Sequence, residues 1–160
     1  MFLELFIADE LAMENLGNKI GTALVSGDII YLSGVLGAGK TTLARGILQG
    51  LGFTGCVTSP TFTLMNIYLA NVPVYHFDFY RLEKSELYEL GLDDYLGQEG
   101  ISIIEWADVG SDVLPQDGLW INIRLANDDY DAGRFLSFKA DGTPAQLIKE
   151  RLHEYADIGY

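Results

Sequence analysis

Apolar residues in the first third of the chain recur at spacings that predict a strand, a helix and a second strand. Residues 2–7 alternate between apolar and polar positions, as in a half-buried strand. Asp9 is placed to cap a helix over residues 10–26, and Gly27 follows where the end of that helix is expected. Residues 28–33 are mostly apolar, which indicates a short buried strand.

The rest of the chain interleaves helical and strand-like segments. Strands are predicted over residues 61–70, 74–78, 101–105, 119–125 and 134–140, and helices over residues 40–50, 84–96 and 144–155. Short turns join the first two and the last two of these strands, so each pair is predicted to be an antiparallel hairpin. We therefore expect one α/β domain over residues 1–160, a three-layer sandwich whose central sheet is mixed and mostly parallel and carries antiparallel hairpins.

The composition is ordinary for a globular protein, with 49% hydrophobic and 21% charged residues. No apolar run approaches the roughly 18 residues that a membrane-spanning helix needs. The N-terminal segment carries Glu4 and Asp9 and lacks a basic start, which argues against a secretory signal. Cys56 is the only cysteine, so an internal disulfide is excluded, and we expect this residue to be half-buried. We expect a cytoplasmic protein without a membrane partner.

The charge balance narrows the choice of partners. Ten Lys and Arg residues face 23 Asp and Glu residues, which gives a formal net charge of −13. A protein that holds nucleic acid by itself needs a positive surface that neutralises phosphates. The composition therefore disfavours direct binding of DNA or RNA, and a basic protein partner is easier to accommodate.

One motif predicts a specific chemistry. The segment GVLGAGKT, Gly34–Thr41, matches the P-loop pattern G-x-x-x-x-G-K-[ST] and lies between a predicted strand and a predicted helix. Its glycines allow successive backbone N–H groups to point at one phosphate, and the helix start adds unpaired N–H groups. Lys40 should bind the β- and γ-phosphates, and the Thr41 hydroxyl should ligate Mg²⁺. The predicted nucleotide contacts are Leu36, Gly37, Ala38, Gly39, Lys40, Thr41 and Thr42. The expected ligands are ATP and Mg²⁺, and the predicted sandwich is P-loop NTPase-like.

Two acidic residues are candidates for holding Mg²⁺ or positioning a water. Asp78 ends the predicted strand VYHFD, and Glu105 ends the predicted strand ISIIE. P-loop proteins place an acidic residue at the end of a neighbouring strand, and the pattern does not decide between these two. His76, in the middle of its strand, is interpreted as a core or interface residue.

The loop between the P-loop helix and the hairpin carries hydroxyl groups. It reads VTSPTFTL, and hydroxyl-rich loops at this position often sense the γ-phosphate, although the spacing alone favours a Ser-Pro turn that opens a strand. Other P-loop classes find less support. The chain has no N-K-x-D guanine motif, no L-S-G-G-Q signature and no arginine-rich lid. A small-molecule or protein kinase and a nucleotide-gated binding module remain alternatives to an ATPase.

The order of these motifs resembles one family, TsaE (YjeE). GVLGAGKTTLARG, VTSPTFTL, VYHFDFYRL, GLDDYL and IIEWAD follow one another at the separations found there, and the similarity extends from about Asp9 to Arg134. These are bacterial ATPases needed to make threonylcarbamoyladenosine in tRNA. The resemblance implies ATP binding and hydrolysis that drive a complex of TsaD and TsaB. The tRNA would then be held only indirectly, through those partners.

The resemblance also implies a role for individual residues. Lys40, Asp78 and Glu105 would be catalytic, and Thr41 and Glu105 would hold Mg²⁺. Ser59 and Thr61 would form a switch, Trp106 would shape the site beside Glu105, and Glu10 and Arg134 would contact the adenosine. One departure is Val35, where the family commonly has Asp; this position is variable in the P-loop pattern, so phosphate binding should survive.

Overall fold

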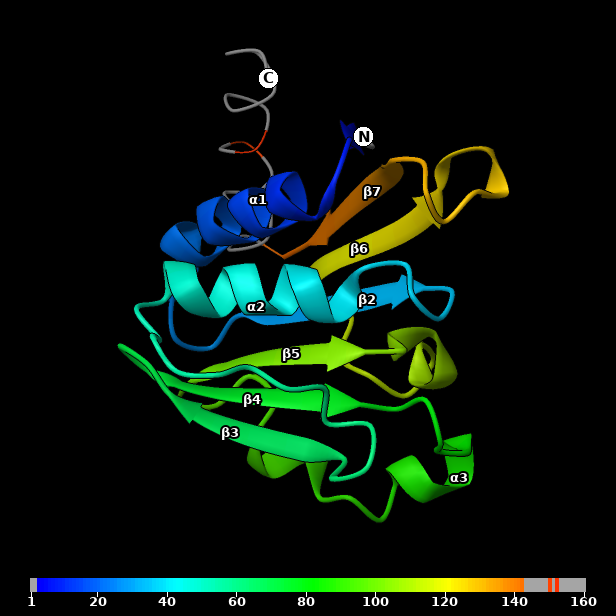
Figure 1. Ribbon diagram of the computed structural model, residues 1–160. Helices are drawn as coiled ribbons and strands as arrows, with labels where there is room; N and C mark the ends of the chain where they lie inside the picture. The colour runs from blue at the N-terminus through cyan, green and yellow to red at the C-terminus, as the bar shows by residue number, and fades with distance from the viewer. Residues whose placement is uncertain (1–2, 143–149, 151, 153–160) are drawn as a thin grey trace.

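A seven-stranded mixed sheet forms the centre of the computed structural model, which describes residues 3–142 together with Glu150 and Leu152 (Figure 1). The strands are β1 (Leu3–Ile7), β2 (Ile29–Gly34), β3 (Met65–Leu69), β4 (Pro73–Asp78), β5 (Ile101–Glu105), β6 (Gly118–Leu125) and β7 (Arg134–Asp141), in the spatial order β1-β7-β6-β2-β5-β4-β3. β6, β2, β5 and β4 are parallel neighbours, and β7 and β3 run against them. β1 is antiparallel to β7 and therefore runs with the parallel group. The predicted mixed, mostly parallel sheet with antiparallel hairpins is confirmed.

Two long helices cover one face of this sheet (Figure 1). Helices α1 (Glu10–Ala23) and α2 (Lys40–Gly50) pack against each other and bury the apolar residues of β1, β2, β5, β6 and β7. Their backbones approach closely because glycines line the contact: a methyl group on Gly17 would lie 2.6 Å from the carbonyl oxygen of Leu43. This packing fixes the start of α2, and with it the end of the P-loop, against the sheet.

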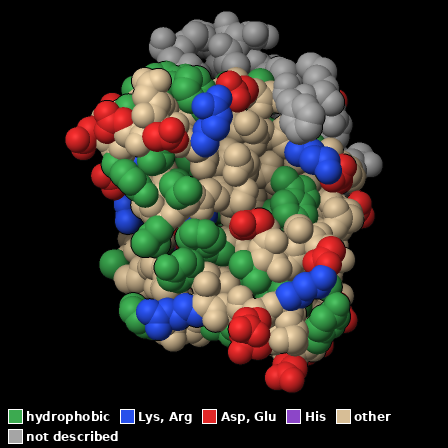
Figure 2. Space-filling model, turned by 90° about the vertical axis from the view of Figure 1, so that its right-hand side faces the viewer, with side chains coloured by type: hydrophobic (Ala, Val, Ile, Leu, Met, Phe, Trp, Pro, Cys, Tyr) green, Lys and Arg blue, Asp and Glu red, His purple; other side chains and the backbone are tan. Residues whose placement is uncertain are grey.

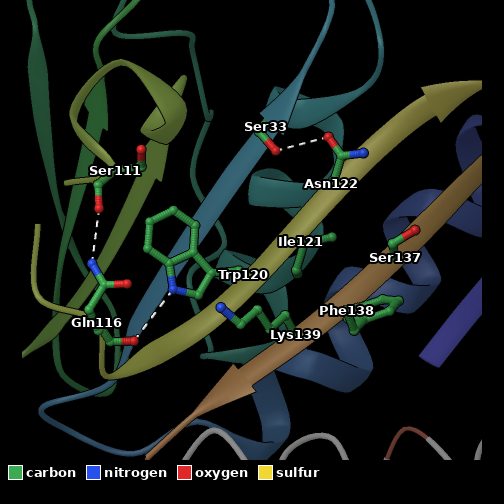
Figure 3. A pocket seen from close by; sticks show the side chains of 9 residues that line it. All are labelled: Ser33, Ser111, Gln116, Trp120, Ile121, Asn122, Ser137, Phe138 and Lys139. Carbon is green, nitrogen blue, oxygen red and sulfur yellow. Dashed lines mark hydrogen bonds between the residues drawn. The ribbon is translucent and has the colours of Figure 1, made fainter. Parts of the chain in front are cut away.

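The other face is only partly covered. The segment between β4 and β6 contains the short helices α3 (Lys84–Leu87), η1 (Leu92–Asp94) and η2 (Ala107–Gly110), and it packs an apolar cluster onto β2, β4 and β5. Across β6 and β7, side chains on this face are half-buried or exposed, among them Trp120 and Lys139. They line a groove of about 320 Å³ over β2, β6 and β7, which we call the open-face groove (Figure 3). The third layer of the predicted sandwich is therefore incomplete over this half of the sheet.

Several predicted boundaries are wrong for identifiable local reasons. The first helix ends at Ala23 rather than near Ser26, because Leu24 adopts an extended backbone. The expected helix over residues 84–96 is interrupted, with Gly91 in a left-handed conformation (φ 66°) between α3 and η1. The expected strand over residues 61–70 begins only at Met65, because a turn precedes it.

Further segments differ from the sequence prediction or extend it. The turn before β3 closes when the amide of Leu64 donates to the carbonyl of Pro60. Cys56 is exposed, not half-buried, because the stretch around it has no regular structure and leaves its side chain in solvent. The helix predicted over residues 144–155 lies mostly outside the described residues. Its two described residues, Glu150 and Leu152, are helical, and Leu152 is buried in the core on the α1–α2 face. Helix η3 (Ala126–Asp128) occupies the turn between β6 and β7.

Candidate functional site

The P-loop follows β2 and wraps around the start of α2. Gly37 (φ 79°) and Gly39 (φ 114°) adopt left-handed conformations that other residues rarely tolerate. Gly39 is the N-terminal cap of α2 and offers no side chain to its first N–H groups. These unpaired N–H groups and the positive end of the helix dipole favour an anion at this point. Ala38 differs from its neighbours, because its N–H donates within the loop to the carbonyl of Val35 over 3.0 Å.

Lys40 lies at the base of the P-loop, almost completely buried. Its Nζ donates to the carbonyl oxygens of Gly34 (2.6 Å) and Val35 (2.9 Å) and lies 4.0 Å from the centre of the Trp106 ring. Burial lowers the pKa of the amine, and the nearby carboxylates of Glu105 and Asp78 oppose that shift. The chain therefore holds a buried cation beside two acidic groups, at the start of the helix that follows the P-loop.

Glu105 and Thr41 meet in the same place although they are far apart in sequence. The Thr41 hydroxyl lies 3.0 Å from Glu105 Oε1 and 3.2 Å from Oε2, to which it can donate. Glu105 Oε2 also lies 2.6 Å from Nε2 of the buried His76. A hydroxyl and a carboxylate are the oxygen ligands that suit Mg²⁺, which takes only one or two protein ligands when phosphates supply others. These two residues therefore fit a magnesium ion bound with a nucleotide.

Asp78 is the register partner of Glu105 on the neighbouring strand, so the two carboxylates lie at the same edge of the sheet. Its environment is different, because its partners come from the hydroxyl-rich loop. Thr61 Oγ1 donates to Asp78 Oδ2 over 2.8 Å, and Ser59 Oγ lies 2.7 Å from Thr61 Oγ1. The amide of Tyr80 donates to Asp78 Oδ1 over 2.8 Å. The structure thus connects the predicted switch residues directly to the second acidic candidate.

Two adjoining cavities surround these groups. The first, which we call the phosphate cavity, has a volume of about 240 Å³. It is lined by Leu36, Gly37, Gly39, Lys40, Thr41, Thr42, Ser59, Thr61, Asp78, Tyr80, Glu105 and Trp106. The second, about 450 Å³, lies between the start of α1 and the loop before β7, and it shares Gly37, Gly39 and Thr42 with the first. Every predicted site residue lines one of the two cavities.

Glu10 and Arg134, which the resemblance predicts to contact the adenosine, both line the larger cavity. The Arg134 guanidinium is already engaged with backbone carbonyls: Nε donates to Ala38 (3.0 Å) and Nη1 to Ala132 (2.7 Å). Arg134 thus ties the P-loop to the loop before β7. Glu10 lies 3.5 Å from Arg45 at the exposed end of α1.

Trp106 occupies an unusual backbone position next to Glu105. Its φ of 59° and ψ of 38° place a bulky residue in the left-handed region, where strain is expected. The ring lies 4.8 Å from that of Tyr80 and faces the Lys40 amine. Strained residues of this kind concentrate at functional sites because the surrounding structure must hold them there.

Comparisons with known proteins identify the family and the fold of the chain. Residues 7–134 match the family model described as "Threonylcarbamoyl adenosine biosynthesis protein TsaE". The chain belongs to the TsaE family. It is 43% identical over 133 residues to the tRNA threonylcarbamoyladenosine biosynthesis protein TsaE of Bacillus subtilis, with 82% of both chains covered. The TsaE protein of Haemophilus influenzae is also 43% identical, over 136 residues, covering 81% of this chain and 84% of the relative.

A solved structure extends the likeness to the fold. The crystal structure of YdiB from Bacillus subtilis matches with a TM-score of 0.81 and 34% sequence identity, covering 98% of this chain and 97% of that one. The predicted TsaE resemblance and α/β fold are both confirmed. None of the helices described in this TsaE-family chain has the length and apolarity needed to span a membrane.

Tyr130 and His76 are among the residues that sequence reasoning did not assign to the site. Tyr130 donates its hydroxyl to the carbonyl of Leu36 over 2.9 Å, and its ring closes one side of the larger cavity. His76, interpreted as a core or interface residue, is buried and also contacts Glu105. Tyr130 is the only aromatic residue in the acidic turn ANDDYDAG before Arg134, and this isolated position is the signal that could have identified it. No local pattern marks His76.

Proposed function

We propose that this TsaE-family chain binds ATP with Mg²⁺ and hydrolyses it in the cytoplasm, in support of threonylcarbamoyladenosine formation in tRNA. One observation carries the proposal: Lys40 and Thr41 at the start of α2, Asp78 at the end of β4 and Glu105 at the end of β5 converge on the phosphate cavity. A buried cation, a hydroxyl and two carboxylates are the groups that a metal–triphosphate complex needs.

The two cavities divide a nucleotide between them. The phosphate cavity would take the phosphates, on the N–H groups at the start of α2 and on Lys40, whose bonds to loop carbonyls would be exchanged for bonds to phosphate oxygens. The larger cavity would take the adenosine, because Met13, Ala38 and Tyr130 give it apolar and aromatic walls. Gly37 and Gly39 line both cavities and have no side chains that would separate the adenosine from the phosphates.

The two carboxylates have different partners, which suggests different roles. Glu105 is paired with Thr41 and would hold Mg²⁺, which neutralises charge on the phosphate oxygens. Asp78 faces the loop hydroxyls and would orient the attacking water and accept its proton. The water oxygen then bonds to the γ-phosphorus, the bond to the bridging oxygen breaks, and ADP leaves. Thr61 would report the presence of the γ-phosphate, since it shares Asp78 with that water.

A protein partner would act at the mouth of the phosphate cavity. Hydrophobic side chains gather on the face of the molecule at the ends of β2 and β5 (Figure 2). Leu36, which lines the cavity, is 63% exposed, and two sequence neighbours of lining residues are also exposed, Val35 by 51% and Phe62 by 84%. Exposed apolar residues around a cavity favour a protein interface. The net charge of −13 disfavours tRNA as the direct ligand, so we propose TsaD and TsaB as the partners.

The test is a reconstitution of tRNA modification with tRNA, a threonylcarbamoyl donor, purified TsaB, TsaD and this chain. We expect slow ATP hydrolysis by the chain alone, faster hydrolysis with the partners, and modified tRNA only when all three proteins are present. Brisk hydrolysis that ignores both partners contradicts the proposal.

Radioactive γ-phosphate distinguishes the alternatives. Label transferred to an acceptor instead of released as free phosphate supports a kinase. Full tRNA modification by a Glu105→Ala protein that binds ATP but does not cleave it supports a nucleotide-gated binding module.

A further inference from the structure

His76 is a buried polar residue beside the proposed metal site. It lies on β4, two residues before Asp78, on the sheet face that carries α1 and α2. Its side chain has no exposed surface, and Nε2 lies 2.6 Å from Glu105 Oε2. Nδ1 is buried and has no hydrogen-bond partner among the described residues. The imidazole thus makes one polar contact, and that contact is with Glu105.

The direction of this hydrogen bond follows from the chemistry of the two groups. An ionised carboxylate can only accept, so Nε2 carries the hydrogen and donates it to Oε2. Thr41 approaches the same carboxylate from α2, 3.0 Å from Oε1. Glu105 is therefore held from two sides, by a strand neighbour and by the first turn of the P-loop helix. This fixes the orientation of its carboxylate plane.

The apolar surroundings of His76 make a polar side chain unfavourable for stability at this position. Val74, the next residue on the same face of β4, is apolar, and the register partner of His76 is Ile103. A polar ring with an unpaired buried nitrogen is less favourable here than a hydrocarbon side chain, because the nitrogen loses its hydrogen bond to water. The contact with Glu105 is the compensation visible in the structure. Buried polar groups that are left unpaired call for a functional explanation.

We propose that His76 is a positioning residue for Glu105. Its Nε2–H holds Oε2 and so presents Oε1, together with the Thr41 hydroxyl, to the Mg²⁺ that accompanies the nucleotide. The inference rests on the proposed function of the phosphate cavity. It assigns His76 to the second layer of groups around the ion, the layer that orients metal ligands.

Two polar substitutions of similar size separate this role from packing. In His76→Gln the side-chain amide extends to about the position of Nε2 and can donate to Glu105. In His76→Asn the amide corresponds to Nδ1 and is too short to do so. His76→Leu removes the hydrogen bond and keeps the volume. Ser102→Ala is the control, because Ser102 is buried on neighbouring β5 but lies outside both cavities.

Metal affinity is measured directly, with Mn²⁺ as a paramagnetic probe titrated into each protein in complex with ADP and followed by EPR. We expect His76→Asn and His76→Leu to bind Mn²⁺ about 10- to 100-fold more weakly, as is typical when a group that orients a metal ligand is removed. His76→Gln and Ser102→Ala should stay within about threefold of the wild type. ADP affinity in EDTA should be unchanged in all four variants, because without the metal ion the orientation of Glu105 does not affect ADP binding.

The outcomes distinguish this inference from the function on which it rests. Wild-type protein whose ADP complex binds no Mn²⁺ overturns the proposed function and the inference with it. Normal Mn²⁺ binding by the Asn and Leu variants, or equal losses in Gln and Asn, overturns the inference alone.

A measurement on the wild type covers variants that fail to fold. The Nε2–H resonance of His76 should be protected from exchange, and it should shift when Mg²⁺ is added to the ADP complex but not when ADP is added in EDTA. An unshifted resonance also overturns the inference.

Discussion

The phosphate cavity and the open-face groove are of comparable size, about 240 and 320 Å³, but they are built from different residues. The phosphate cavity contains three charged side chains that are almost fully buried, Lys40 (5% exposed), Asp78 (4%) and Glu105 (2%). The charged residue that lines the groove, Lys139, is exposed, and its Nζ lies 3.4 Å from Asp141. Burying a charge is unfavourable unless the charge is paired, so the buried charges indicate a functional constraint on the phosphate cavity that the groove does not show.

The backbone shows the same contrast. The phosphate cavity is bordered by left-handed residues in the P-loop and by Trp106, whose conformation is strained. The groove lies mainly on extended strands, and its Trp120 stacks on Tyr31 with ring centres 4.0 Å apart. Ser33 and Asn122, also in the groove, bond to each other. Between these two, the groove has the larger volume, but buried charge and backbone strain favour the phosphate cavity as the functional site.

The two lysines give the sharpest test of this contrast. Lys40→Ala should weaken ATP binding about a thousandfold, because two charge-assisted hydrogen bonds at roughly 1.5–3 kcal/mol each are lost. Isothermal titration with ATP and Mg²⁺ measures the effect. Lys139→Ala, in the groove, should bind ATP as the wild type does. Comparable losses in both variants would mean that ATP is not bound in the phosphate cavity.

Asp78→Asn should separate hydrolysis from binding. The amide keeps the shape of the side chain but cannot accept a proton from water, so we expect kcat to fall about a hundredfold with ATP affinity little changed. Single-turnover hydrolysis and equilibrium ATP binding are measured on the same preparation. A variant that loses binding instead would assign Asp78 to the nucleotide complex itself.

Local motifs made much of this site predictable from sequence. The P-loop is contiguous, so its pattern identifies Lys40 and Thr41 directly, and the neighbouring apolar strand and helix supply the fold around it. Asp78 and Glu105 were found because parallel strands deliver their last residues to one edge of a sheet. The pattern did not decide between the two, and the roles proposed for them rest on their partners in the structure, Thr61 for Asp78 and Thr41 for Glu105.

The features that sequence missed depend on tertiary contacts. His76 lies 29 residues from Glu105, and Tyr130 lies 94 residues from the P-loop carbonyl that it contacts. Periodicity places a residue on a face of its own element but says nothing about the side chain opposite. The helix expected over residues 84–96 was wrong for a related reason, because that segment bends at Gly91 while it covers the apolar face of β2, β4 and β5.

Thr61→Val tests the link between the loop and Asp78. One hydrogen bond is lost and the volume is kept, so kcat should fall about fivefold, as expected for a bond contributing roughly 1 kcal/mol, and Thr61→Ser should restore it. Ser137→Ala makes the equivalent change in the groove and should leave hydrolysis unaltered. If Thr61→Val hydrolyses ATP as fast as the wild type, the hydroxyl of Thr61 contributes nothing to the reaction and the link to Asp78 is overturned.

The two tryptophans give the smallest effect and the most direct optical comparison. Trp106→Phe keeps an aromatic face toward the Lys40 amine but weakens the cation–π contact, so ATP affinity should fall only about threefold. Wild-type fluorescence should change when ATP and Mg²⁺ are added, because Trp106 borders the phosphate cavity and Trp120 lies in the groove. The change should disappear in Trp106→Phe and persist in Trp120→Phe. The reverse result would place the nucleotide on the open face of the sheet, where the structure offers a cavity without buried charge to bind it.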